Sequence, residues 1–239
     1  MRSSTLFLAA VLLAAGPVPT QAAVSAAGPG AAPTSDRVLV VELFSSQACA
    51  SCPAANAVVA ELAQGDATVL PLDLHVTYFD RAGWKDRDSL PAASQRQQRY
   101  VAQLGTPGVY TPQVVVGGRH EALGYDAPAV RAAVALARGE AGGVPLGLSV
   151  DPAGLRVQAG AGQGRGTLWL VGFDGPARRR GPGVNHEFNP GVNTVRALQE
   201  VGGWHGAPVS LTAAAPRGAR TAVLLQDDRG AILAAALLR

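Results

Sequence analysis

Two cysteines, Cys49 and Cys52, are the residues whose type and spacing most directly indicate chemistry. They are the only cysteines of the chain, Ala50 and Ser51 separate them, and Pro53 follows. Two thiols at this spacing can form a disulfide and exchange it with thiols of another molecule, and the thiolate is the reactive form. A cysteine with a pKa near ~8.5 is about 3% thiolate at pH 7, whereas one lowered to ~7 is about half thiolate.

Two other uses of the pair stay open. A disulfide that closes a loop of about four residues constrains the unfolded chain by only roughly 2 kcal/mol, so a purely structural bond would stabilise little. Two cysteines supply half of a zinc site, and there is no second pair. His75 could stabilise the Cys49 thiolate, join Cys49 and Cys52 in binding copper, or be a hydrogen-bonded structural residue. We expect no cofactor other than the redox-active disulfide.

The flanking segments place the pair between a strand and a helix. Residues 38–44 form an apolar, β-rich run, residues 45–48 a turn, and residues 49–64 a helical stretch that Gly65 ends. The unpaired N–H groups and positive dipole at a helix start would favour a thiolate at Cys49. Cys52 lies a turn further on and suits the role of resolving thiol.

The elements that follow alternate first and then form a hairpin and a closing helix. The predicted order is β-α-β-α-β-β-α, over residues 38–44, 49–64, 68–76, 91–104, 113–116, 121–125 and 127–138. Two strands joined through a helix pair in parallel with a right-handed crossover. With the cysteine pair, this order predicts an α/β, thioredoxin-like domain over residues 37–139.

The Thr111–Pro112 bond begins the third predicted strand. In thioredoxin-like folds a cis-proline at this place lies against the cysteine pair, and the backbone group before it pairs with the substrate chain. We therefore predict a cis bond here, although only about 5–6% of X–Pro bonds are cis. Pro112 is a candidate catalytic residue and Thr111 a candidate substrate-binding residue.

Three further residues are candidates for the same site. Glu42 on the first strand would be a buried acid that moves protons to the resolving thiol, or alternatively a partner of an arginine or of solvent. Tyr78 and Trp84 follow the second strand at its carboxyl end, where such sites gather. They are expected to rim the site and bind substrate, with ordinary packing as the alternative for Trp84.

Residues 140–239 have a different pattern. Short apolar runs separated by Gly/Pro turns predict a small antiparallel β-sandwich-like domain. The expected strands are a hairpin over 146–158 and runs at 166–173, 208–213, 219–226 and 231–238, with a short helix over 194–201.

The N-terminal segment predicts export. A positive start, an apolar run of about ten residues and small residues near Ala23 are typical of a secretory signal peptide over residues 1–23, and residues 24–36 form a flexible leader. A retained membrane anchor is the alternative. We expect a periplasmic or secreted protein that leaves the membrane after cleavage. The net charge of +3, with Arg178–Arg180 as the densest basic run, argues against nucleic acid as a partner.

Several longer motifs occur in a specific order. They lie at residues 41–53 (VELFSSQACASCP), 75–80 (HVTYFD), 83–86 (GWKD), 95–97 (QRQ) and 109–119 (VYTPQVVVGGR). By these motifs, residues 38–138 resemble the secreted thioredoxin-like proteins of domain-of-unknown-function family 1223, and the tail is also similar. The resemblance implies the fold and export, and it implies no known substrate. Ala48, Thr77 and Phe79 depart from the usual Gly, Asp and Trp of that family.

These observations predict an exported thiol–disulfide oxidoreductase acting on protein or small-molecule thiols and disulfides in its compartment. The alternative is a non-catalytic thioredoxin-like binding or scaffold module with a structural disulfide, or a copper-binding protein.

Overall fold

The structure is a computed structural model and describes residues 37–140, 143–176 and 192–238. The predicted signal peptide, the leader and Arg178–Arg180 lie outside these residues. Within the described ranges, no helix has both the length and the apolar character needed to cross a bilayer.

The first half of the chain follows the predicted order of elements. It comprises β1 (Leu39–Ser45), α1 (Cys52–Gly65), β2 (Val69–His75), α2 (Pro91–Leu104), β3 (Gln113–Val116), β4 (His120–Leu123) and α3 (Ala127–Gly139). β1 and β2 pair in parallel, as expected for strands joined through a helix, and β3 is antiparallel to both β1 and β4. The Thr111–Pro112 bond is cis, as predicted.

The second half contains strands, with one difference from the prediction. They are β5 (Leu146–Asp151), β6 (Gly154–Ala159), β7 (Gly166–Asp174), β8 (Asn193–Trp204), β9 (Val209–Ala213), β10 (Arg220–Asp227) and β11 (Ile232–Leu237). The predicted helix over 194–201 is wrong, because this segment is part of β8. β8 pairs with β7 along its length and buries Val195 and Trp204, so non-local pairing overrides the local helical preference.

The main sheet runs through both halves of the chain. Its eight described strands lie in the order β11-β10-β7-β8-β2-β1-β3-β4, and β5, β6 and β9 form a second sheet of three strands. The two halves meet where β2 pairs in parallel with β8 at Leu72 and Asp73. A domain boundary at residue 139 stays a prediction, and hydrogen bonding of the sheet continues across it.

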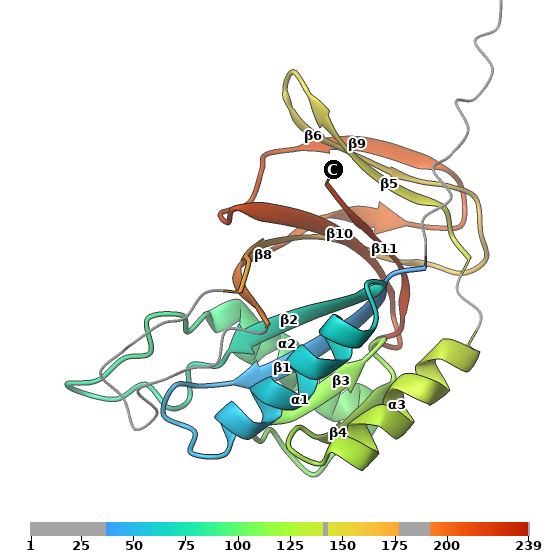
Figure 1. The fold of residues 1–239 in the computed structure, drawn as a ribbon. Helices are drawn as coiled ribbons and strands as arrows, with labels where there is room; N and C mark the ends of the chain where they lie inside the picture. Colours follow the sequence, from blue (N-terminus) through green and yellow to red (C-terminus); the bar gives the residue numbers. More distant parts are fainter. Residues whose placement is uncertain (1–36, 141–142, 177–191, 239) are drawn as a thin grey trace, which may run out of the picture. The chain divides into compact units, whose positions relative to one another are not determined.

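Alternate residues of β1 face different layers. Val40 and Phe44 belong to the apolar cluster that includes Tyr100 of α2, whereas Val41 and Leu43 belong to the cluster beneath α1 and α3. Figure 1 shows α1 and α3 lying over β1 and β3, with α2 behind these strands. A third cluster joins the three-stranded sheet to β7 and β10, which is sandwich-like packing. The cysteine helix α1 and the helix α2 therefore cover opposite faces of β1.

Candidate functional site

Cys49 and Cys52 form a disulfide at the start of α1. The helix begins at Cys52 and not at Cys49 as predicted, because the Cys52 N–H donates to the Cys49 carbonyl oxygen at 3.2 Å and closes a turn ahead of the helix. Pro53 then occupies the first turn, where its missing N–H costs nothing. Cys52 is completely buried and Cys49 is 5% exposed. Solvent therefore reaches the pair only through Cys49. The exposed fraction of Cys49 is smaller than expected for a nucleophile.

The start of α1 favours negative charge. Its first turn contains no acidic residue, and the N-cap residue Ser51 makes no side-chain capping hydrogen bond. The positive end of the helix is thus not neutralised by a neighbouring carboxylate of that turn. The Ser51 hydroxyl also lies 3.8 Å from the Cys49 sulfur. A thiolate at Cys49 would be stabilised by both features.

The Pro112 loop packs against the first turn of α1 through Gly124. The Gly124 N–H donates to the Pro112 carbonyl oxygen at 2.9 Å. A Cβ at Gly124 would lie 2.8 Å from the Ala55 Cβ and 3.1 Å from the Pro112 Cβ. Since Ala55 is in the first turn of the helix that begins at Cys52, this close approach holds Pro112 beside the cysteine helix.

Gly124→Ala is therefore expected to push α1 and the Pro112 loop apart. An added methyl in a well-packed contact typically costs about 1–3 kcal/mol, and urea unfolding would measure the loss. Gly108→Ala is the matched control, because a Cβ at Gly108 meets no atom within 4 Å. Equal stabilities of the two variants would contradict the tight contact.

The predicted substrate-binding residues lie in two groups. Tyr78 is 43% exposed, and the side chains of Gln97 and Thr111 lie close enough to lower the pKa of its hydroxyl. Partial burial raises the pKa of Tyr78 more than these two side chains lower it. Trp84 packs within its own loop, where the Arg81 guanidinium lies 5.5 Å from the ring centre. The structure thus joins Tyr78 to Thr111, and gives Trp84 a packing contact.

Glu42 does not face the cysteine helix. Its carboxylate accepts from Arg96 Nε at 2.5 Å and Nη2 at 3.1 Å, and from the Tyr100 hydroxyl at 2.5 Å, all on the α2 side of the sheet. The alternative that Glu42 pairs with an arginine therefore describes the structure. Proton transfer from Glu42 to Cys52 has no geometric support, because β1 separates the two groups.

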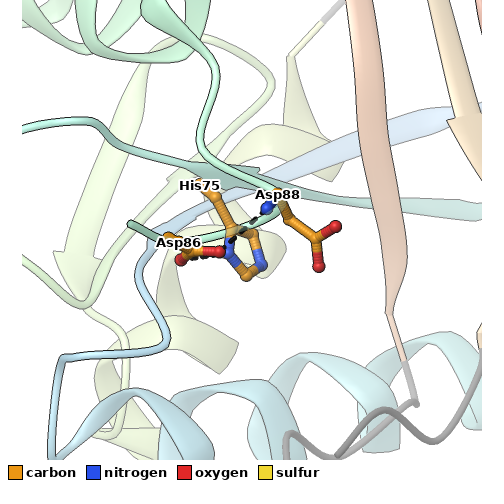
Figure 2. A group of neighbouring side chains, drawn as sticks. All are labelled: His75, Asp86 and Asp88. Carbon is orange, nitrogen blue, oxygen red and sulfur yellow. Dashed lines mark hydrogen bonds and ion pairs between the residues drawn. The ribbon is translucent and has the colours of Figure 1, made fainter. Parts of the chain in front are cut away.

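His75 lies in a buried cluster of carboxylates at the end of β2 (Figure 2). Its Nδ1 is 2.8 Å from Asp86 Oδ2 and its Nε2 is 3.3 Å from Asp73 Oδ2. Burial lowers the pKa of His75, but the charges and hydrogen bonds of Asp73 and Asp86 outweigh burial and raise it to about 10. His75 is therefore an imidazolium at neutral pH. These contacts match the alternative in which His75 is a hydrogen-bonded structural residue.

A metal site at His75 fits this geometry poorly. One ligand atom each from His75, Asp86 and Asp88 lies within 4.8 Å of the others. Both histidine nitrogens, however, bond to carboxylates, and Arg196 pairs with Asp88. A protonated imidazole has no lone pair for a metal. Binding by His75 with Cys49 and Cys52 would in addition need a reduced pair, because the two sulfurs are bonded to each other.

A second part of this cluster reaches α1 and was not predicted. Asp73 accepts hydrogen bonds from Ser45 Oγ and from Asn56 Nδ2, the latter at 3.0 Å. Asn56 follows Cys52 by four residues on the same buried face of α1. The signals available in the sequence were a lone Asp between Leu72 and Leu74 in an apolar strand, and this four-residue spacing.

Fold and site define a mixed α/β protein with a large mixed sheet and a CxxC disulfide at a helix start. The chain belongs to the DUF1223 family, described as protein of unknown function, whose family model matches residues 40–227. Among curated proteins nothing matches the chain.

Two solved structures are similar. Protein AGR_C_4864 from Agrobacterium tumefaciens is 30% identical with a TM-score of 0.69, over 85% of this chain and 95% of that chain. HBP35 of Porphyromonas gingivalis is 13% identical with a TM-score of 0.60, over 84% of this chain and 74% of that chain, which shows a shared fold alone.

Proposed function

We propose that this protein is an exported thiol–disulfide oxidoreductase whose thioredoxin-like domain exchanges the Cys49–Cys52 disulfide with protein or small-molecule thiols. The observation that carries the proposal is the asymmetry of the disulfide. Its second sulfur belongs to a wholly buried residue, and the first belongs to the residue that keeps solvent contact beside an uncompensated helix start. Such an arrangement favours attack at Cys49 and departure of Cys52.

Oxidation of a partner by the Cys49–Cys52 disulfide takes place in two steps. A partner thiolate attacks the Cys49 sulfur, the Cys49–Cys52 bond breaks, and Cys52 leaves as a thiolate that takes up a proton. The partner's second thiolate then attacks the partner sulfur that is bonded to Cys49, the mixed disulfide breaks, and Cys49 leaves as a thiolate that takes up a proton. The partner is oxidised to a disulfide and the pair is reduced to two thiols; the reverse sequence reduces a partner disulfide.

The strand arrangement supports the thioredoxin-like part of the proposal. β2, β1, β3 and β4 are adjacent in that order, β1 and β2 are parallel, and β3 is antiparallel to its neighbours. This strand order and these directions are the ones expected for a β-α-β-α-β-β-α thioredoxin-like domain, and they support the proposal. The contact of Pro112 with the cysteine helix through Gly124 fits the same domain.

Export is supported by the pattern of the first 23 residues and by the resemblance to secreted proteins. Structural disulfides and their exchange belong to oxidising compartments, which suits a periplasmic or secreted site of action.

The decisive experiment is trapping. A Cys52→Ser variant cannot resolve a mixed disulfide, so it should accumulate partners bound through Cys49 when expressed in its native compartment. Cys49→Ser is the matched control and should trap none. Mixed disulfides would be detected as bands that disappear on reduction. If folded Cys52→Ser captures no more than Cys49→Ser, exchange through Cys49 is wrong.

The reduction potential separates this function from that of a binding module with a permanent disulfide. Exchange proteins have potentials of roughly −120 to −270 mV, and structural disulfides lie below about −300 mV. Equilibration of the purified protein with glutathione or dithiothreitol buffers measures the value.

A further inference from the structure

Asn56 carries a buried amide oxygen without a partner. The side chain is 1% exposed, and Oδ1 is one of three buried side-chain atoms in the described residues that have no hydrogen bond. An unpaired buried carbonyl costs free energy because it has lost its hydrogen bonds to water. A donor that appears in another state of the molecule would offset this cost, and a redox role is one of the recognised explanations for such a group.

The orientation of the amide is determined by its other end. Asn56 Nδ2 donates to Asp73 Oδ2 at 3.0 Å, and a carboxylate accepts but does not donate. Asp73 is itself held by Ser45 Oγ and by the His75 imidazolium, whose Nε2 is 3.3 Å away. The amide therefore cannot turn over, and its oxygen, not its nitrogen, is the unpaired end.

The missing donor lies one helical turn away. Cys52 and Asn56 are four residues apart in α1 and are both buried on its sheet-facing side. Side chains four apart on a helix have Cβ atoms about 5–6 Å from each other, and helical side chains lean toward the preceding turn. In the disulfide form Cys52 has no proton to donate. Reduction creates an S–H group at this position.

We propose that Asn56 is a positioning residue for thiol exchange, whose Oδ1 accepts the S–H proton of Cys52 when the pair is reduced. This inference rests on the proposed function in one respect, namely that the pair cycles between disulfide and dithiol. Reduction takes two electrons and two protons from an external dithiol, which becomes a disulfide, and one of the protons resides on Cys52. The hydrogen bond stabilises only the reduced form and holds Cys52 as a buried neutral thiol.

The first test observes the hydrogen bond without any exchange reaction. Because the chain has two cysteines, Cys49→Ser leaves Cys52 as its single thiol. The infrared S–H stretching band of this variant is expected at a lower frequency than in the urea-unfolded protein. Adding Asn56→Leu should move the band of the folded protein up. A folded Cys49→Ser protein whose band shows no hydrogen bond overturns the proposal, even if the double variant does not fold.

The second test measures the equilibrium of the pair with dithiothreitol. Asn56→Leu removes both the acceptor of the reduced form and the unpaired carbonyl of the oxidised form. The constant should shift toward the disulfide by about tenfold, equivalent to ~30 mV for a two-electron couple. Ser45→Ala is the control, because it removes the hydrogen bond from the Ser45 hydroxyl to Asp73 and leaves Asn56 Oδ1 in place. This variant should lower the free energy of unfolding but change the equilibrium constant with dithiothreitol less than twofold.

The outcomes separate the two proposals. A shifted S–H band together with a potential below the exchange range keeps the hydrogen bond from Cys52 to Asn56 Oδ1, but rejects oxidoreductase function and with it a role of Asn56 in exchange. Trapping by Cys52→Ser supports exchange. If Asn56→Leu at the same time changes neither the S–H band nor the equilibrium constant with dithiothreitol, the role of Asn56 is rejected. An equal shift of the constant in Ser45→Ala would show a general effect of the cluster and would overturn the role of Oδ1.

Discussion

Arg96→Leu is expected to lower the free energy of unfolding by about 3–5 kcal/mol, because it leaves a carboxylate buried without its counter-ion. Arg96 and Glu42 are each at most 1% exposed, and two guanidinium nitrogens bond to the Glu42 oxygens. Arg96 also donates to Gln226 on β10 at 2.9 Å. The substitution thus removes a contact that ties α2 to both halves of the main sheet.

A double-mutant cycle checks the cause. Arg96→Leu combined with Glu42→Leu should recover much of the lost stability, because an apolar pair in place of a buried ion pair is often nearly neutral. Arg131→Leu is the exposed control: Arg131 lies 3.5 Å from Glu61 and the side chains are 52% and 74% exposed. Its expected cost is below ~1 kcal/mol. A loss in Arg96→Leu no larger than in this control would refute the argument.

His75 should make stability depend on pH in the alkaline range. Its pKa rises from 6.5 to about 10 on folding, so the folded state binds a proton that the unfolded state releases above pH 6.5. The stabilisation is fully present below pH 6.5 and is lost as pH rises through 10. At ~1.4 kcal/mol per pKa unit, its size is on the order of 5 kcal/mol, reduced where the neighbours relax.

The charged groups that face His75 come from several elements. Asp73 lies on β2, Asp86 and Asp88 follow that strand, and Arg196 on β8 pairs with Asp88. Hydrogen bonding by His75 and backbone N–H groups outweighs burial and lowers the pKa of Asp86, so its contribution is lost only in acid, below about pH 4. Between pH 6.5 and 10 the difference in pH dependence of the free energy of unfolding between wild type and a His75 variant therefore reports the titration of His75.

The measurement is urea unfolding of wild type and His75→Gln at half-unit steps from pH 6 to 10.5. The stability difference between them should be largest at pH 6 and shrink toward pH 10. His120→Gln is the control, since it removes a less buried pair with Glu140 and keeps His75. It should retain the wild-type slope. A constant difference between wild type and His75→Gln would show that His75 is neutral in the folded protein.

Much of the first half was predictable because its signals are local. The elements predicted at residues 91–104 and 113–116 coincide with α2 and β3, and β1 and β2 begin and end within one residue of the prediction. The length of an apolar run, a Pro at a helix start and a Gly after a helix end each influence the backbone of only a few neighbouring residues. The segment 194–201 shows the limit, because its strand pairing with β7 and β2 lies outside any local window.

The CxxC pair at a strand–helix junction and the order of elements follow from the sequence, since neighbouring residues carry these properties. The cis bond at Thr111–Pro112 follows from the place of this proline in thioredoxin-like folds, since the local sequence favours a trans bond. Which face of β1 each helix covers depends on long-range packing. That choice paired Glu42 with Arg96, 54 residues away, and brought Asp73 to Asn56, 17 residues away. Alternation in a strand specifies that two faces differ, and the packing of distant segments specifies which charges and which thiol each face meets.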